Sequence, residues 1–199
     1  GPTASITVTR TGGSDFQVGA TVSLANGSAT APADYDSTAL TVSFAPGDTA
    51  TKTVNVPIVD DALDEIDETV NLSLASATGG ASIGAQSTAT LTITDNDPTP
   101  SLSINDQSIA EGNAGTTAFA FTVTLSAASG QTVTVQAQTA DGTATAASGD
   151  YTAAGPTTLT FTPGQTQQTF TVQVAGDTTN EAAETFFVNL TSPSNATIS

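Results

Sequence analysis

The stretch LTVSFAPGDTATKTVNVPI, residues 40–58, alternates apolar and polar residues on both sides of a Pro-Gly pair. Apolar residues occupy every second position from Leu40 to Phe44 and again from Val54 to Ile58. Because successive side chains of a β-strand point to opposite faces, each run predicts a strand that is buried on one face. Pro46-Gly47 is a turn signal between them, so the stretch predicts two antiparallel strands.

The same period of two recurs along the chain, in residues 70–74, 89–93, 119–125, 170–174 and 186–190. These runs are rich in Thr and Val, which favour strands, and no segment shows a helical period. Turn-forming pairs such as Asn26-Gly27, Asp141-Gly142 and Pro163-Gly164 separate them. Many short strands at this spacing predict an all-β protein made of antiparallel, immunoglobulin-like β-sandwiches.

The chain also repeats itself at a separation of about 116 residues. GSATAPADY (27–35) is similar to GTATAASGDY (142–151), and DALDEIDETVNLSL (61–74) is similar to DTTNEAAETFFVNL (177–190). We therefore predict two copies of one module, residues 1–97 and residues 98–199. They are joined by Pro-Thr-Pro, a short linker in which the two prolines favour extended backbone and limit bending.

The two copies begin at different points of the repeat. SLSINDQSIAEGNAG (101–115) has no counterpart before Thr3, and STATLTITDND (87–97) has none before Ser199. We therefore expect copy one to lack its first strand and copy two its last. Gly1-Pro2 resembles the residue pair left by cleavage of a fusion tag, which suggests a piece of a longer protein. Unpaired strand edges recruit other chains, so we expect possible contacts with other copies of this chain.

The charge of the chain is sparse and almost entirely negative. There are 19 acidic residues against one Arg and one Lys, for a net charge of −17, and only 11% of residues are charged. Binding to nucleic acid or to an anionic membrane needs clustered Lys and Arg, so we expect neither partner. No apolar run approaches the ~20 residues of a membrane-spanning helix, so we expect no membrane insertion.

Two missing residue types restrict the chemistry further. The chain has no Cys and no His, which excludes disulfides, thiolate metal sites and the commonest general base. A zinc site is therefore not expected. Paired carboxylates alone could serve a glycosidase, but the chain has no Trp and only two Tyr to stack on sugars. We therefore expect a protein that is not an enzyme.

The acidic residues are concentrated in VDDALDEIDET (59–69), where six of eleven residues carry a carboxylate. Two unit charges ~4 Å apart repel by about 4 kcal/mol at an effective dielectric near 20. Such a cluster is tolerable if its side chains extend into water, if some hold protons, or if a cation lies between them.

Three acidic loops of copy one can meet if they fall at the same end of the sandwich. They would then bring together Asp34, Asp60, Asp61, Glu65, Glu68, Asp95 and Asp97. Calcium takes ~6–8 oxygen ligands in a flexible geometry and fits this set better than magnesium. No segment has the spacing of an EF-hand loop.

The combination of GSATAPADY, FAPG, VDDALDEIDETVNLSL and TLTITDND resembles the Calx-β domain, a family found in sodium–calcium exchangers and as tandem repeats in bacterial surface proteins. The resemblance covers both copies. It implies a Ca²⁺ site at one tip of each sandwich, with the seven copy-one carboxylates above as ligands. In copy two it implies the ligands Glu111, Asp150, Asp177, Glu181 and Glu184.

Copy two departs from this pattern, with Gly176 in place of Asp60, Asn180 in place of Asp64 and Ala183 in place of Asp67. We therefore expect copy one to bind calcium better.

Each candidate residue also has a simpler interpretation. Asp34 and Asp150 could cap a turn, Glu68 and Glu184 could face water, and Asp95 and Asp97 could form a polar linker. For Asp64 and Asp67 we expect exposure to solvent. Tyr35 and Tyr151 are expected to be packing residues.

The resemblance favours a calcium-binding structural or adhesive repeat of an extracellular bacterial protein, with calcium ions as its partners and an adhesion target that the sequence does not name. A regulatory calcium-sensor pair is a second interpretation. A third is a metal-independent spacer or a cadherin-like adhesion module, because TDNDP resembles a cadherin linker.

Overall fold

The computed structural model describes residues 1–199 and contains thirteen β-strands and no helix, which confirms the all-β prediction. The chain divides into two compact units. The first comprises Gly1–Asp61 and Ile66–Asp95, and the second comprises Ala62–Glu65 and Asn96–Ser199. No helix of the chain could cross a membrane.

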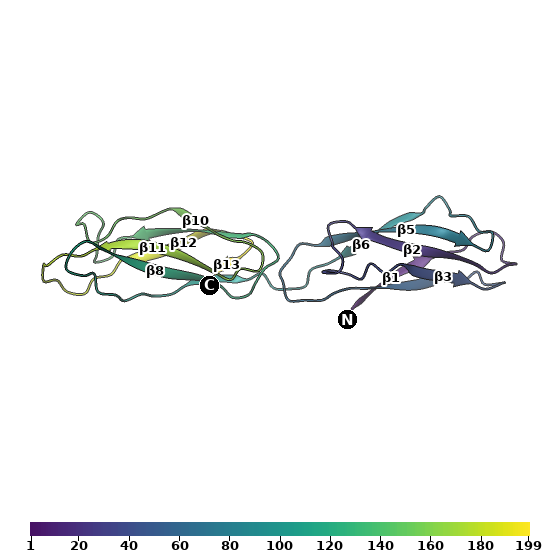
Figure 1. Cartoon of the computed structure of the whole chain (residues 1–199), viewed down its shortest axis with the longest axis horizontal. Coiled ribbons are helices and arrows are strands. Elements are labelled where there is room, and N and C mark those ends of the chain that lie inside the picture. Colours follow the sequence, from purple (N-terminus) through teal and green to yellow (C-terminus); the bar gives the residue numbers. More distant parts are fainter. The chain divides into compact units, whose positions relative to one another are not determined.

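The first unit is a sandwich of two antiparallel sheets (Figure 1). One sheet has two strands, β1 (Thr3–Val8) and β4 (Lys52–Pro57). The other has the order β3-β2-β5-β6, with the strands β3 (Leu40–Phe44), β2 (Val18–Asn26), β5 (Glu68–Thr78) and β6 (Thr88–Ile93). The strands β3 and β4 are the two that residues 40–58 predicted, but they lie in different sheets, so the Pro46-Gly47 turn connects the two layers and not two paired strands.

The second unit repeats this plan with more strands in one sheet. One sheet has the order β10-β9-β12, with β10 (Thr157–Phe161), β9 (Val133–Ala140) and β12 (Phe187–Ser194). The other has the order β11-β8-β7-β13, with β11 (Gln167–Ala175), β8 (Thr116–Leu125), β7 (Ser101–Ile104) and β13 (Thr197–Ile198). The strands β13 and β7 are parallel, which is an exception to the predicted antiparallel pattern.

Alternation in sequence becomes alternation of burial in both units. In β3, Val42 and Phe44 are buried while the residues between them are exposed, and β11 buries Phe170 and Val172 in the same way. Full burial of one such side chain stabilises a fold by about 1.5–3 kcal/mol. Each unit has its own cluster of buried apolar residues, so each unit has a core of its own.

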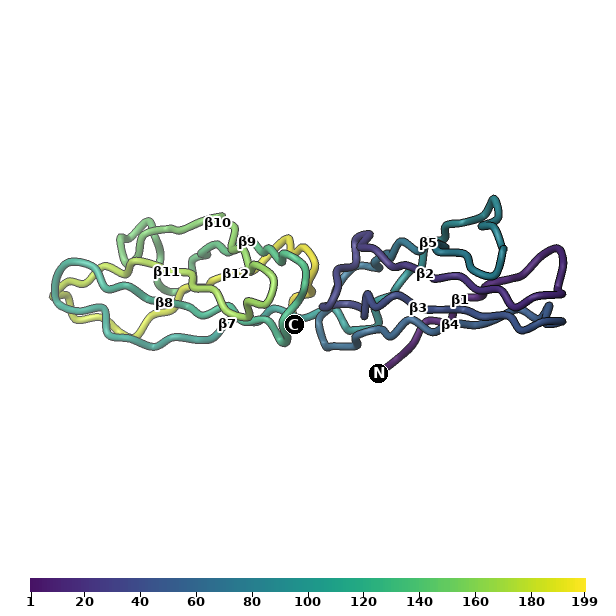
Figure 2. Tube along the Cα trace, turned by 45° about the vertical axis from the view of Figure 1, so that its right-hand side comes forward, coloured from purple at the N-terminus to yellow at the C-terminus, as the bar shows by residue number.

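The two units share local details as well as their plan. Tyr35 forms an isolated bridge to Ile58, and Tyr151 forms the same bridge to Val174. Ser76 and Ser192 both adopt positive φ, at 49° and 50°. These equivalent positions lie 116 residues apart in the sequence, as the predicted repeat requires. In Figure 2 the connections of each unit gather at the two ends of its strands, so loops from distant parts of the sequence can meet there.

Candidate metal centres

A close contact between two backbone segments shapes the loop that follows β2. A Cβ atom at Gly27 would lie 2.5 Å from Thr69 Oγ1 and closer still to the Thr69 carbonyl oxygen. That carbonyl accepts hydrogen bonds from the N–H groups of Gly27 and Ala29, and Thr69 N–H donates to Ser28 Oγ. Gly142 makes the same close approach to Thr185 in the second unit. Both loops are therefore held tightly against the residue that follows a candidate glutamate, Glu68 in the first unit and Glu184 in the second.

Asp34 and Asp150 each close a turn within this loop. The Thr30 N–H and hydroxyl both donate to Asp34 Oδ2, at 2.6 and 3.1 Å. In the second unit, the Thr145 N–H and the Ser148 hydroxyl donate to Asp150 Oδ2 at 2.7 Å each. The turn-capping interpretation is therefore correct for both residues. It does not exclude metal binding, because the turn uses one carboxylate oxygen, Oδ2, of each.

A buried tyrosine fixes the same loop by a hydrogen bond to a residue that the sequence predicts only as a turn former. The Tyr35 hydroxyl donates to Asn26 Oδ1 at 2.8 Å, and the same oxygen accepts from Ala31 N–H. In the second unit, Tyr151 donates to Asp141 Oδ1 at 2.6 Å, and Ala146 N–H donates there too. The repeat of Asn/Asp-Gly with a Tyr nine or ten residues later was the sequence signal for this contact.

Burial of these tyrosines raises the pKa of both hydroxyls, and a neighbouring carboxylate adds to the effect. Both side chains lie in the cores, as the packing interpretation expected.

In the first unit, Asp34 and Glu68 each offer a carboxylate oxygen, and these oxygens lie within 4.8 Å of one another. This pair is the first acidic set, and both of its residues are half-buried. Glu65 belongs to the second unit. Four further candidates lie outside the first set, namely Asp60, Asp61, Asp95 and Asp97. The backbone N–H of Asp95 donates to Asp67 Oδ1 at 3.0 Å, so Asp67 holds the start of the segment that contains two of them.

The expectation that Asp64 faces solvent is wrong. Asp64 is only 6% exposed. Its side chain accepts hydrogen bonds from the Thr99 hydroxyl at 3.2 Å, the Ser129 hydroxyl at 3.3 Å and the Gln131 amide at 3.2 Å. Its backbone carbonyl accepts from Ser129 and Gly130 as well. Burial is possible because these polar partners replace the water that the carboxylate loses.

The second acidic set consists of Glu111, Asp177 and Glu181, whose carboxylate oxygens also lie within 4.8 Å of one another. The segment that carries Glu111 passes close to Gly176, where a Cβ atom would lie 2.7 Å from Gly112 O and 2.8 Å from Glu111 O. The glycine that replaces the aspartate of copy one is therefore what lets Glu111 approach Asp177.

The neighbouring carboxylates of the second unit raise the pKa values of Glu181 and Glu184. The negative charge of Asp177 raises the pKa of Glu181, with smaller contributions from burial and from Glu184, Glu111 and Asp150. Burial raises the pKa of Glu184, and Asp150 and Glu111 add to this. The hydrogen bond from the Thr145 N–H lowers the pKa of Asp150, and the bond from the Ser148 hydroxyl lowers it further.

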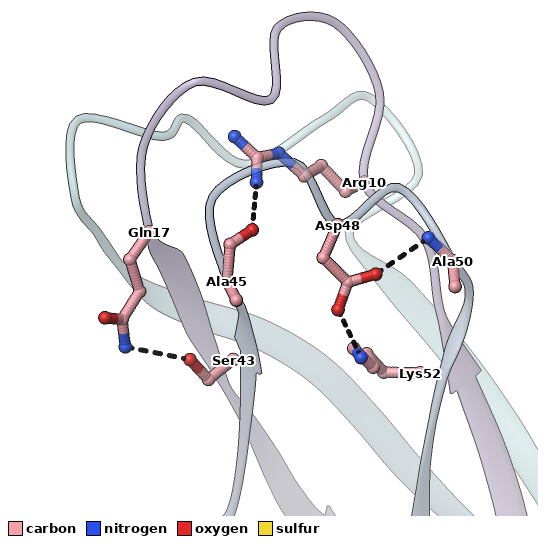
Figure 3. Close-up of polar contacts among 7 residues, drawn as sticks. All are labelled: Arg10, Gln17, Ser43, Ala45, Asp48, Ala50 and Lys52. Atoms are coloured by element: carbon pink, nitrogen blue, oxygen red, sulfur yellow. Dashed lines mark hydrogen bonds and ion pairs between the residues drawn. The ribbon is translucent and has the colours of Figure 1, made fainter.

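The two basic residues do not relieve this repulsion. Lys52 Nζ lies 2.5 Å from Asp48 Oδ2 and lowers the pKa of that carboxyl group. The Arg10 guanidinium donates to the backbone oxygens of Gly13, Phe16 and Ala45. Figure 3 shows Lys52 and Arg10 beside the Ala45–Ala50 turn, with Asp48 as the acidic partner. Both acidic sets therefore contain only carboxylate donors, which suit a hard divalent cation.

The model of the Calx-beta domain family matches residues 2–97 and 99–198, which together are almost the whole chain. The chain belongs to the Calx-beta domain family. Comparison with curated protein sequences gave no match.

Solved Calx structures are similar at low identity. The crystal structure of CBD12 from CALX1.2 is 23% identical with a TM-score of 0.46, over 96% of this chain and 74% of that one. The calcium binding domain CBD12 of CALX1.1 is 22% identical with a TM-score of 0.47, over 96% and 73%. The apo-form Calx CBD1 domain is 24% identical with a TM-score of 0.45, over 48% and 83%. The family model, which covers both copies, is what assigns this chain to the Calx-beta domains.

Proposed function

We propose that this chain is a pair of calcium-binding Calx-beta domains. The observation that carries the proposal is the second acidic set, where Asp177 raises the pKa of Glu181 and the second unit itself contains no Lys or Arg. Repulsion of this kind weakens a fold unless a cation offsets it. The first set, with Asp34 and Glu68, supports the same proposal.

Calcium is the cation that this donor set favours. Carboxylates from different loops suit the flexible coordination of Ca²⁺ better than the strict octahedron of Mg²⁺. Asp34 and Asp150 are positioned for this role by the turns that they close, since the turn holds each carboxylate through its Oδ2 atom. A bound Ca²⁺ would supply charge neutralisation and would link the loops that provide the ligands.

The proposed role is therefore stabilisation of each module by its ion. Carboxylates that bind a cation only in the folded state stabilise that state by about 2.7 kcal/mol when the cation is at one hundred times its Kd. Extracellular modules bind calcium with a Kd of ~10⁻⁴–10⁻³ M. We further propose that the chain acts outside the cell, as a structural or adhesive repeat of a bacterial surface protein, and that it has no catalytic role.

Calorimetric titration of the EDTA-treated protein with CaCl₂, and with MgCl₂ for comparison, tests the proposal. We expect calcium-selective binding and a rise in Tm of several degrees at a few millimolar calcium. A variant with Asp177→Asn and Glu181→Gln should lose the binding of the second unit, whereas Asp106→Asn, an exposed acid of the same unit outside the set, should not. An unchanged titration in the double variant would mean that this set binds no ion.

The first set is tested in the same way with Asp34→Asn and Glu68→Gln, and with Asp15→Asn as the matched exposed control. If copy one binds calcium better, as the sequence suggests, this variant should remove the tighter of the two binding phases. Protein that shows no calcium-dependent heat and no change in Tm would refute calcium binding altogether.

A further inference from the structure

We propose that the outer face of the sheet β10-β9-β12 binds a neutral, extended polysaccharide through three amide side chains and one exposed phenylalanine. The face belongs to the second unit and is made by strands, whereas the candidate calcium ligands lie in loops and at strand ends. The proposal names a class of ligand for the adhesive role proposed above and rests on that role, but the binding itself needs no calcium.

Alternation along the strands decides which side chains lie on this face. In β9 and β12, residues that pack against the core alternate with residues that point outward. The outward-facing residues include Phe187 and Asn189 of β12 and Gln136 and Gln138 of β9. Thr158 of β10 adds a hydroxyl group to the same face, opposite Gln136. The three strands lie side by side in Figure 2.

The pairing register places the phenylalanine beside the amides. Asn189 lies directly opposite Gln138. Side chains that lie opposite each other in an antiparallel pair are about 4.5–5.5 Å apart at Cβ. Phe187 is two residues from Asn189 on the same strand, which is about 7 Å along the sheet. One extended ligand can therefore contact the aromatic ring and the amide pair together.

The three amides are available to a ligand. No hydrogen bond within the chain uses the side chain of Gln136, Gln138 or Asn189, whereas Gln107 and Gln131 donate to Ala120 O and to Asp64 Oδ2. An amide side chain offers two N–H donors and a carbonyl acceptor. Each hydroxyl group of a sugar is both a donor and an acceptor, so neighbouring sugar hydroxyls match this set.

Phe187 supplies an apolar surface next to these polar groups. It is 56% exposed, whereas Phe186 stacks on Tyr151 in the core with ring centroids 4.6 Å apart. A single exposed apolar residue is common and indicates nothing alone. Beside three unused amides, it gives the combination of apolar surface and a few polar groups that ligand sites use. The ring can pack on the C–H groups of a sugar while the amides bind its hydroxyl groups.

Charge and composition favour a neutral polysaccharide over other partners. The strands β9, β10 and β12 carry no charged residue, and the second unit has no Lys or Arg. An anionic polysaccharide, or a second copy of the chain, would be repelled by the net charge of −17. A protein partner needs a core of several apolar side chains in the interface, and this face offers one large apolar side chain.

The first unit shows that a strand beside β12 would leave this face open. There β6 pairs with β5, the counterpart of β12, and Asn71 at the position of Phe187 is still exposed. At the positions of Gln136, Gln138 and Asn189, the first unit has the short side chains of Thr21, Ser23 and Ser73. The first unit therefore lacks the long amides and the ring, and it serves as an internal control.

NMR titration of the isotope-labelled whole chain in EDTA tests the proposal, with cellohexaose, mannohexaose and laminarihexaose as the neutral probes. With at least one of them, we expect the side-chain amide signals of Gln136, Gln138 and Asn189 and the ring signals of Phe187 to shift. The signals of Ser23 in the first unit should not shift.

Variants that carry the residues of the first unit separate the contributions. Gln138→Ser with Asn189→Ser should weaken binding at least about fivefold, because hydrogen bonds to the ligand are lost. Phe187→Asn should also weaken it. These positions are on the surface, so the variants should keep the Tm of the parent protein. Gln173→Ser removes an exposed amide of β11, in the other sheet, and should leave binding unchanged.

Four results would overturn the proposal. The first is the absence of shifts at the four residues with all three probes at millimolar concentration. The second is an equal response of both units, which would mean non-specific contact. The third is equally strong binding of oligogalacturonate, an anionic probe, in EDTA. The fourth is a dimer in light scattering that Phe187→Asn abolishes, which would mean that a second copy covers the face. Because the titration is done in EDTA, its failure and a failure of calcium binding are separate results.

Discussion

Replacement of Gly27 by Ala tests the close approach that positions the loop carrying Asp34. The added Cβ atom would lie 2.5 Å from Thr69 Oγ1, about 0.9 Å short of ordinary van der Waals contact at 3.4 Å. The neighbouring atoms include the Thr69 carbonyl, which is backbone and cannot rotate away. The loop must therefore move away from β5 by nearly 1 Å.

That movement breaks hydrogen bonds whose lengths are known. Gly27 N–H and Ala29 N–H donate to Thr69 O at 3.1 and 3.0 Å. At roughly 4 Å neither contact is a hydrogen bond. Each contributes about 0.5–1.5 kcal/mol, so with residual crowding we expect a loss of about 2–3 kcal/mol from the free energy of unfolding. For a domain of this size, that lowers Tm by roughly 10–20 °C.

Differential scanning calorimetry in EDTA measures the effect without interference from bound metal. Gly84→Ala is the matched control, because a Cβ atom at Gly84 meets nothing within 4 Å and its φ is not positive. We expect the control to melt within about 2 °C of the parent protein. If Gly27→Ala does the same, the close approach of the loop to Thr69 is wrong. Because Asp34 lies on the displaced loop, calcium binding at the first set should weaken in parallel.

Three further predictions concern buried polar groups and charge. Tyr151→Phe should lower Tm more than Tyr35→Phe, because the Tyr151 hydroxyl donates to a carboxylate and the Tyr35 hydroxyl to an amide oxygen. Thermal melts of the two variants measure this order, and a reversed order would contradict the prediction. Asp64→Ala should cost about 1–3 kcal/mol in urea unfolding, because the Thr99 hydroxyl and the Gln131 amide lose their acceptor. A cost near zero, equal to that of the exposed control Asp15→Ala, would contradict the burial. The repulsion that raises the pKa of Glu181 means that the folded state holds its proton more tightly than the unfolded state, so stability in EDTA should fall as pH rises above 4.5. The urea midpoint of unfolding, measured from pH 4 to 7, should fall less steeply with pH in Glu181→Gln than in the parent protein. An unchanged slope would show that the neighbouring carboxylates do not repel the charge of Glu181.

Part of the candidate site was predictable from the sequence, because the spacing of the acids and the repeat are one-dimensional signals. Asp34 and Glu68 occupy repeated motifs, and the first acidic set contains both. Which other acids join them depends on how each loop bends, which no local pattern encodes. Glu68 lies in the first set whereas Asp60 and Asp61 lie outside it, although the three residues are close in sequence.

The hydrogen-bond partners of the loops were not predictable in this way. In the sequence, Asn26 and Asp141 look like ordinary turn residues. Only the fold shows that their side chains accept hydrogen bonds from Tyr35 and Tyr151. Asp64 looks like one more solvated acid in an acidic run. It is buried because Ser129 and Gln131, more than sixty residues away, supply its hydrogen bonds.

The sequence by itself determined the all-β class, most of the strands and the tandem repeat, since alternation and turn residues act over a few positions. Tertiary structure alone decided the parallel pairing of β13 with β7 and the approach of Glu111 to Asp177 past Gly176. Each of these depends on contacts between segments far apart in the chain. Such contacts are set by packing of the whole core and by satisfaction of buried polar groups, and neither is a property of a local stretch of residues.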